Sequence, residues 1–321
     1  MQELLSFIPP SRSLSSGEDR FYFTTDEGKL YGRGRDDENV RLINLPWPIR
    51  MVSFNGRSTS ALTYTGKVYS WYNSGTVFDT TPLPRLQELA SPVVSISAGW
   101  ESVMAVTVDG SLYSLSDHSP VLVDLPLTCQ SAVCLKHINH AITIDGSLYR
   151  WGKDGYIQPH ERINTSYSDT PFKVEFDEPV SMISAGNRHA LILTVSGMVY
   201  SYGDNHYGQM GTLIDQTVDT PVLVVLPAPC KLITCGSYHS FFVLETGELY
   251  GCGESTAGEL GVVAYEIRTP VLIDTRKDIS LMDGSYSHSL MMTLGVQVYY
   301  TGILMGDRDG VIVSGFTEVM L

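Results

Sequence analysis

The 321-residue sequence is short of positive charge, of long apolar stretches and of cysteine. It has 21 lysine and arginine residues against 35 aspartate and glutamate residues, which gives a formal net charge of −14. Phosphate binding depends on clustered basic residues and no such cluster is present, so we expect no direct binding to nucleic acid. No apolar run approaches the ~20 residues that a membrane-spanning helix needs, so we expect no membrane insertion.

Cysteine occurs five times, an odd number. Two close pairs, Cys129 with Cys134 and Cys230 with Cys235, have C-x4-C spacing and no histidine at supporting spacing, which disfavours a zinc site. The five thiols are therefore expected to be reduced core residues, as in a cytoplasmic or nuclear protein. No secretory signal is evident at the start of the sequence, so the expected localisation is the cytoplasm or the nucleus.

Motifs of enzymatic chemistry are also missing. The sequence has no phosphate-binding loop, no Gly-x-Ser-x-Gly and no His-Glu-x-x-His, and its carboxylates are scattered without an isolated pair in an apolar setting. We therefore expect that the chain is not an enzyme and that it has no catalytic residue, no metal and no cofactor.

What the sequence does have is a repeat. A small-residue strand ending in glycine, a loop, an apolar strand, a tight turn and a strand containing Leu-Tyr or Val-Tyr return seven times. In five copies the two glycines stand 11 residues apart, at 17/28, 99/110, 186/197, 236/247 and 284/295. The second glycines of all copies, at 28, 66, 110, 146, 197, 247 and 295, have a period of 36 to 51 residues. A chain-wide repeat of this length is typical of propeller blades.

We therefore expect an all-β fold, a seven-bladed β-propeller of four-stranded antiparallel blades that is closed by terminal strands. A single domain covers 1–321 and is expected to be monomeric. Its repeats lie at approximately 1–44, 45–88, 89–126, 127–175, 176–226, 227–274 and 275–321. Two segments, 4–8 and 317–321, resemble outer strands, and we expect the second to pair at the junction with the first blade. Asp109-Gly110 and Asp145-Gly146 predict two-residue hairpin turns between second and third strands.

A histidine recurs at one repeat position, in His189, His239 and His288, and the fourth copy has His140 or His137 near it. A catalytic site would need one such residue with unlike neighbours. Recurrence around the ring instead favours a structural role, in which a partly buried imidazole is hydrogen-bonded to backbone.

Residues that vary between copies are more informative about binding, because a propeller keeps its strands and diversifies its loops. The residues after the first glycine of each copy lie, by the repeat symmetry, on one face around the central channel. We expect a protein partner to bind this face, since aromatic residues and arginine are enriched at interface hot spots. The candidate residues are Trp100, Glu101, Asn187, Arg188, Tyr238 and Tyr286. The opposite face and the connector 153–170 are the alternatives.

Several of these patterns match a known family. Ala-Gly-x-x-His followed by Gly-x-Val/Leu-Tyr-x-Tyr/Trp-Gly, with Gly-Gln-Met-Gly at 208–211 and Gly-Glu-Leu-Gly at 258–261, resembles the repeats of the regulator of chromosome condensation family. The resemblance covers essentially the whole chain and is strongest from 180 to 275. It implies a seven-bladed β-propeller. The four-residue loop motif is missing from the first four repeats and from the last.

The resemblance and the missing enzymatic motifs together indicate a non-catalytic protein-protein interaction propeller that acts as a regulatory or scaffold subunit. Its partner is expected to be another protein, either a small GTPase or a larger complex. The alternative function is a guanine nucleotide exchange factor for a Ran-like small GTPase. Founding members of the resembled family release nucleotide from Ran by binding and distorting it, and such activity needs no covalent catalytic residue. They use an inserted β-hairpin, and the connectors of this chain show no convincing counterpart.

Overall fold

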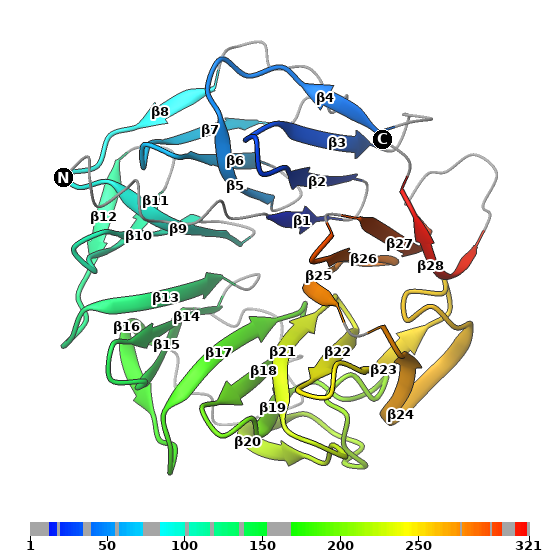
Figure 1. Cartoon of the computed structure of the whole chain (residues 1–321). Helices are drawn as coiled ribbons and strands as arrows, with labels where there is room; N and C mark the ends of the chain where they lie inside the picture. Colours follow the sequence, from blue (N-terminus) through cyan, green and yellow to red (C-terminus); the bar gives the residue numbers. More distant parts are fainter. Residues whose placement is uncertain are drawn as a thin grey trace.

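The computed structural model describes residues 13–17, 20–34, 40–54, 58–72, 84–99, 103–115, 119–134, 138–152, 168–276, 278–295, 297–303 and 312–319. Over these ranges the strands form seven antiparallel sheets of four strands each. The sheets are arranged as blades in a ring (Figure 1). The expected all-β, seven-bladed propeller is confirmed. No helix in the described part of the chain is long and apolar enough to cross a membrane.

Each blade uses four consecutive strands. The first blade has β1 (Leu14–Ser16), β2 (Arg20–Thr24), β3 (Leu30–Gly34) and β4 (Arg41–Ile43). The second has β5 (Ile49–Phe54), β6 (Ser58–Thr63), β7 (Val68–Tyr72) and β8 (Arg85–Gln87). The third has β9 (Val93–Ala98), β10 (Val103–Thr107), β11 (Leu112–Leu115) and β12 (Pro120–Val123). The fourth has β13 (Cys129–Cys134), β14 (Ile138–Thr143), β15 (Leu148–Gly152) and β16 (Ser168–Val174).

The last three blades follow the same order. The fifth has β17 (Val180–Ala185), β18 (His189–Thr194), β19 (Val199–Gly203) and β20 (Val218–Val224). The sixth has β21 (Cys230–Cys235), β22 (His239–Leu244), β23 (Leu249–Ser255) and β24 (Ala264–Asp274). The seventh has β25 (Ile279–Gly284), β26 (His288–Thr293), β27 (Val298–Gly302) and β28 (Val313–Glu318).

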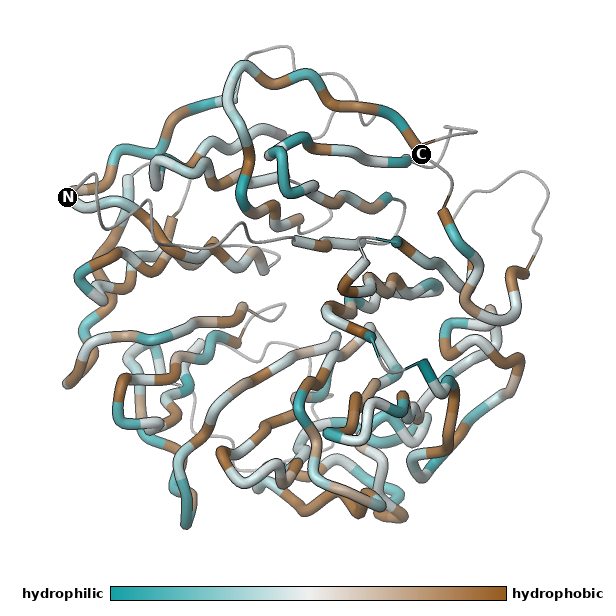
Figure 2. The backbone as a smooth tube through the Cα atoms, viewed as in Figure 1, coloured by the Kyte–Doolittle hydropathy of each residue, from teal (hydrophilic) through white to brown (hydrophobic). Residues whose placement is uncertain are grey.

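The core lies between neighbouring blades. The second strands β22 and β26 are buried at every position, because blades cover both of their faces. Phe241 and Val243 of β22 pack in one cluster with Met291 of β26, which belongs to the next blade. Similar clusters join the other blades, so apolar segments are distributed around the whole ring (Figure 2). The five thiols are free and buried within this core.

Hairpins join the second and third strands, as expected, but their loops are longer than two residues. In the β10–β11 hairpin the N–H of Gly110 donates to the Thr107 carbonyl at 2.9 Å, and the N–H of Thr107 donates to the Ser111 carbonyl at 2.9 Å. Gly110 has φ of 78°. The loop is therefore a turn followed by a left-handed glycine bulge, with three residues between the paired positions. The hairpin at Gly146 has the same hydrogen bonds.

At five junctions the carbonyl of the hairpin glycine also accepts a backbone hydrogen bond from the next blade. The N–H of Ile49, at the start of β5, donates to the Gly28 carbonyl at 2.8 Å, and that of Cys230 donates to the Gly197 carbonyl at 2.9 Å. A Cβ on Gly28 would lie 2.7 Å from the Cβ of Pro48 in the second blade. Glycine is therefore required there both for its backbone conformation and for the close approach of the next blade.

Hydrogen bonds also join the first, innermost strands of neighbouring blades. At four junctions a serine hydroxyl accepts a backbone N–H of the following blade. The bonds run from Phe54 to Ser15 at 2.9 Å, from Ala98 to Ser53 at 2.8 Å, from Cys134 to Ser97 at 3.1 Å and from Cys235 to Ser184 at 2.9 Å. Between the seventh and first blades the acceptor is a carboxylate instead, because Asp283 occupies the serine position and binds the N–H of Ser16 at 2.5 Å.

Contrary to the expectation from the sequence, the C-terminal strand does not pair with the first blade. β28 pairs antiparallel with β27, with Tyr299 opposite Glu318, and so completes its own blade instead of pairing with the first blade. Closure comes from side chains, since Phe21 of the first blade packs in one cluster with Leu290 of the last, and Val319 lies against this cluster. Among the described residues of the seventh blade, β28 is the strand that pairs with the outer edge of β27, so it is needed there as the fourth strand. The segment 4–8 lies outside the described residues.

Candidate partner-binding face

In the fifth, sixth and seventh blades the structure describes the loops between the first and second strands, which carry the expected partner-binding face. Asn187 and Arg188 lie between β17 and β18, Tyr238 lies between β21 and β22, and Tyr286 lies between β25 and β26. Trp100 and Glu101 lie outside the described residues, so their predicted place on this face stays a prediction.

Three tyrosines form a continuous row on this face. The ring centroids of Tyr207 and Tyr238 are 5.3 Å apart, with a 60° angle between the ring planes. Those of Tyr238 and Tyr286 are 5.7 Å apart, with an angle of 78°. We call Tyr207, Tyr238 and Tyr286 the tyrosine row. Asn187 extends it, because its side-chain Nδ2 donates to the hydroxyl of Tyr238 at 3.0 Å. Three of the predicted residues are therefore brought together.

Tyr207 was not among the residues predicted from sequence. It lies in the connector between β19 and β20, directly before the Gly-Gln-Met-Gly motif at 208–211. The connector reaches the sixth blade, since a Cβ on Gly208 would lie 2.6 Å from the Cα of Arg268. An aromatic residue next to the motif was the only available signal, and the corresponding position of the sixth blade holds Ala257.

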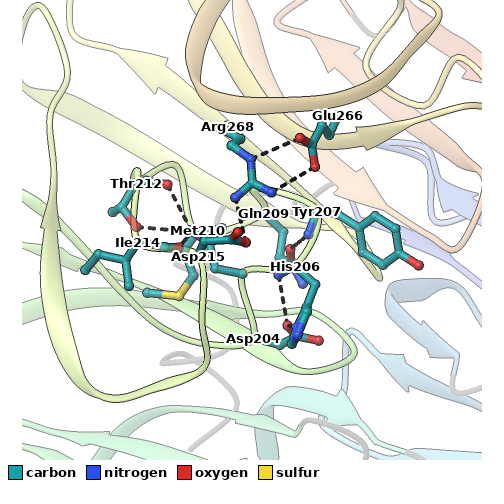
Figure 3. A network of polar contacts seen from close by, with 11 residues as sticks. Asp204, His206, Tyr207, Gln209, Met210, Thr212, Ile214, Asp215, Glu266 and Arg268 are labelled. Atoms are coloured by element: carbon teal, nitrogen blue, oxygen red, sulfur yellow. Dashed lines mark hydrogen bonds and ion pairs between the residues drawn. The ribbon is translucent and has the colours of Figure 1, made fainter.

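A buried glutamine positions Tyr207. The side-chain Oε1 of Gln209 accepts the N–H of Tyr207 at 2.9 Å, and its carbonyl accepts the Ser240 hydroxyl of the sixth blade at 2.7 Å. Figure 3 shows the bond between Gln209 and Tyr207 within a wider polar network, with the ring of Tyr207 pointing away from it. In the sixth blade Glu259 takes the same role and accepts the N–H of Ala257 at 2.9 Å. Burial raises the pKa of Glu259 to about 7.

The seventh blade is shifted by one residue relative to the sequence alignment of the repeats. The N–H of Gly186, of Gly236 and of Ser285 each donates to the carbonyl of the histidine that follows, so Ser285 and not Gly284 takes the glycine position. Gly295 likewise falls one residue before the hairpin position, which is why it is absent from the glycines with positive φ. The shift places Tyr286 one position earlier in its loop than Tyr238, and the two rings meet edge to face.

Backbone hydrogen bonds hold these loops together. The N–H of Asn187 donates to the Ser237 carbonyl at 3.1 Å, and the N–H of Ser237 donates to the Ser285 carbonyl at 2.8 Å. The fifth, sixth and seventh blades are thereby linked in sequence at the face. The tyrosine row consequently has a rigid support, while Tyr286 keeps 38% of its surface exposed.

Carboxylates flank the tyrosine row. Asp204 is buried and accepts the N–H of His206 at 3.0 Å, and the His206 imidazole Nδ1 also contacts it. The N–H of Glu254 donates to the Tyr238 carbonyl at 2.9 Å, which fixes Glu254 beside the row. Burial raises the pKa of Tyr207, and the negative charge of Glu254 is the next largest cause.

The recurring histidines are buried, and His189 and His239 bind side-chain hydroxyls of the next blade and not the expected backbone groups. The Nε2 atoms of His189 and His239 hydrogen-bond to the hydroxyls of Ser240 and Ser289 in the next blade, at 2.9 and 2.8 Å. Burial lowers the pKa of His189 to about 4 and that of His239 to about 3, so both rings are neutral near pH 7. These histidines therefore join blades and lack the exposure that a ligand site needs.

The fourth blade departs from this pattern. His140 lies two residues beyond the recurring position, which Ile138 occupies, because Ile138 pairs with Gly152 as His189 pairs with Gly203. The His140 ring is buried and its Nε2 contacts the hydroxyl of Tyr202 in the next blade. His137 lies outside the described residues. No group of three or more potential metal ligands occurs within the described ranges.

The repeats match a known family model. The regulator of chromosome condensation (RCC1) repeat matches residues 196–243 in one form and residues 180–209 and 230–259 in another. The chain is an RCC1-like repeat β-propeller.

Curated relatives of this propeller are larger proteins. The E3 ubiquitin-protein ligase HERC2 of Mus musculus is 30% identical over 190 residues, which cover 50% of this chain and 4% of HERC2. The regulator of chromosome condensation of Homo sapiens is 24% identical over 181 residues, which cover 53% of this chain and 34% of that protein. The chain thus spans about a third or less of the length of these two relatives.

A solved structure supports the same fold. Prp20p from Saccharomyces cerevisiae, whose structure is described together with its binding to Gsp1p and histones, superposes on the RCC1-like propeller with a TM-score of 0.72. The match has 17% sequence identity and covers 92% of this chain and 83% of Prp20p. At this identity the likeness concerns the fold alone.

Proposed function

We propose that this RCC1-like propeller is a non-catalytic protein-protein interaction module, acting as a regulatory or scaffold subunit in the cytoplasm or nucleus. The supporting observation is the tyrosine row, which presents aromatic surface on one face from the β19–β20 connector of the fifth blade and from the β21–β22 and β25–β26 loops of the sixth and seventh blades. Tyrosine supplies a large contact area with little loss of side-chain entropy on binding, and it is enriched at interface hot spots. Asn187 and Arg188 extend the proposed surface.

Site-specific photo-crosslinking tests this proposal. A benzophenone amino acid is introduced at Tyr238 in one variant and at Tyr64 in another. Tyr64 lies in a β6–β7 hairpin, at the opposite face, where its hydroxyl contacts the Asp26 carbonyl. We expect crosslinks to one defined protein from position 238 and not from position 64. The same crosslinked protein from both positions, or none from position 238, would contradict the proposed face.

A second candidate is nucleotide exchange on a Ran-like small GTPase. It is favoured by the similarity to the human regulator of chromosome condensation and by the fold shared with Prp20p, a protein that binds Gsp1p. The test is the release of a fluorescent guanine nucleotide from a purified Ran-like GTPase with and without the propeller. If the propeller accelerates nucleotide release and Tyr238→Ala abolishes the acceleration, exchange would be assigned to the face that carries the tyrosine row. If the propeller leaves the rate of release unchanged, this candidate function would be rejected.

A further inference from the structure

We infer that the tyrosine row receives an arginine side chain from a basic segment of the protein partner. This inference rests on the proposed interaction function and specifies the chemistry of the partner. Three observations carry it: the ring geometry, the local excess of carboxylates and the half-buried setting of the row.

The ring geometry provides aromatic faces for a flat cation. Adjacent ring planes in the tyrosine row lie at 60° and 78°, so in each pair the edge of one ring lies against one face of the other, and no face is covered by parallel stacking on another tyrosine of the row. A tyrosine face carries negative potential and attracts a guanidinium placed over it. The chain already uses this contact elsewhere, since the guanidinium of Arg276 lies 4.0 Å from the ring centroid of Tyr299.

The charge around the row is negative. Residues 186–215, 236–240, 254–268 and 284–288 include five carboxyl groups and two guanidinium groups. The pKa of the buried Glu259 is about 7, so near neutral pH the net charge of these residues lies between −2 and −3. The carboxylates are Asp204, Asp215, Glu254, Glu259 and Glu266, and the guanidinium groups are those of Arg188 and Arg268. Arg268 is already bound, to Glu266 at 3.0 and 3.1 Å and to Asp215 at 3.0 Å. This ion-pair network leaves Glu254 beside the tyrosines as a carboxylate that an incoming cation can approach.

The wider chain adds to this potential. Residues 212–321 contain 13 acidic and five basic side chains, so the sixth and seventh blades that support the row are acidic overall. Such a field steers a basic segment towards this side of the propeller. Arg188 is the basic residue at the edge of the row, and it favours an approach from the side of the sixth and seventh blades, where Glu254 lies.

Partial burial of the tyrosine row favours binding of an arginine side chain over that of a lysine side chain. Tyr207 and Tyr238 are each partly covered by their neighbours, so a bound cation loses part of its hydration. Guanidinium is more weakly hydrated than ammonium, and its planar shape allows stacking on a ring together with a hydrogen bond to a carboxylate. A neutral side chain of the same shape would keep the stacking but lose the attraction to the ring faces and to Glu254.

The experiment measures binding of three fluorescently labelled peptides to the intact protein by anisotropy at low ionic strength. Each is a glycine-serine nonapeptide with three substituted positions, carrying arginine, lysine or citrulline. Citrulline has the shape of arginine without its charge. We expect the arginine peptide to bind about tenfold more tightly than the citrulline peptide, and more tightly than the lysine peptide.

Variants that leave the net charge unchanged distinguish peptide binding at the tyrosine row from nonspecific electrostatic attraction between a basic peptide and an acidic protein. Tyr238→Ala leaves the net charge unchanged and should weaken arginine-peptide binding about three- to tenfold. Tyr238→Phe keeps the ring and should bind the peptide as the unmodified protein does. Tyr64→Ala, on the opposite face, is the matched control and should have no effect. Near-ultraviolet circular dichroism of each variant confirms that folding is retained.

Equal binding of the arginine and citrulline peptides would overturn the inference, and so would full binding by Tyr238→Ala or an absence of arginine-peptide binding. These results leave the crosslinking test of the interaction face unaffected. A defined crosslink at position 238 together with no preference for arginine would retain the interaction function and reject the basic partner. An arginine preference without any crosslinked protein would show that the tyrosine row binds arginine and would reject a protein partner at this face.

Discussion

Asp283 accepts two hydrogen bonds from Ser16, one from the backbone N–H at 2.5 Å and one from the hydroxyl at 2.6 Å, across the junction that closes the ring. Serine occupies the equivalent acceptor position at four other junctions. Burial raises the pKa of Asp283 to about 7, despite the lowering effect of the bonds from Ser16. The closing junction is therefore the one among these that has an ionisable acceptor.

Replacing this carboxylate should change how stability depends on pH. The pKa of Asp283 is higher in the folded protein than its ordinary value of 3.8, so the folded state binds the proton more tightly. The contribution of Asp283 to the free energy of unfolding is fully present below about pH 4 and is lost as the pH rises to about 7. Because the residue as a whole is partly exposed, we expect less than the full effect of this shift, a loss of about 2 kcal/mol between pH 4 and pH 8.

Asp283→Ser restores the recurring residue and should remove this loss. The measurement is the free energy of unfolding in urea at pH 5 and pH 8 for both proteins. Exposed Asp278 provides the control variant, Asp278→Ser, which should keep the pH dependence of the unmodified protein. An identical pH dependence in Asp283→Ser would show that the carboxylate is not linked to closure.

The buried histidines predict the opposite trend at lower pH. The pKa of His239 falls from 6.5 to about 3 on folding, so below pH 6.5 the unfolded chain binds a proton that the folded chain excludes. Stability is therefore lost as pH falls from about 6.5 towards 3, by up to about 1.4 kcal/mol per pH unit for each such histidine. His239→Gln should reduce the slope of unfolding free energy against pH by about one proton between pH 6 and pH 4. A slope equal to that of the unmodified protein would contradict the neutral, buried assignment.

The inner glycines should not tolerate a methyl group. A Cβ on Gly236 would lie 2.1 Å from Cε1 of the buried His239 ring, which the seventh blade holds in place through Ser289. We expect Gly236→Ala to lower stability by about 2–3 kcal/mol through overpacking. Gly295→Ala is the matched control, since the nearest atom would be 3.7 Å away and φ is not positive. Thermal unfolding of the two variants checks this, and equal melting temperatures would count against a crowded inner position.

The outer strand of the last blade should also contribute to stability. Phe316 of β28 lies 6.1 Å from Phe241 of the sixth blade, measured between ring centroids, and belongs to the cluster that joins the two blades. Phe316→Ala should lower the free energy of unfolding by about 1–3 kcal/mol, and deletion of residues 316–321 should lower it further. Calorimetry of both variants tests this. A melting temperature unaffected by the deletion would show that β28 is dispensable for blade packing.

The repeat count and the blade architecture were predictable because glycine spacing reports a backbone requirement. Gly28 and Gly110 have positive φ and a tight neighbour in the next blade, so substitution is restricted at these two positions. In the seventh blade the glycine spacing gave an alignment that is wrong by one residue. Gly284 and Gly295 both lie one residue early, so their separation of 11 residues hides the shift.

Contacts between blades were less predictable than contacts within them. The sequence pattern identifies His189 and His239 as equivalent, but their partners Ser240 and Ser289 lie about 50 residues away, in positions that only the stacking of blades brings close. Tyr207 was missed for the same reason, because its connector is irregular and has no counterpart of similar sequence in five of the repeats. Local sequence patterns specify the strands of one blade, whereas the packing of one blade on the next determines which residues of different blades meet.

The tyrosine row takes its three rings from loops and a connector that are supported by separate blades. A partner that engages all three rings would bridge the fifth, sixth and seventh blades and oppose any rotation between them. Binding would then be coupled to mechanical stiffness of this half of the ring, so that occupancy raises the force or temperature at which these blades part. The three tyrosines that would recognise the partner would then also hold the fifth, sixth and seventh blades together.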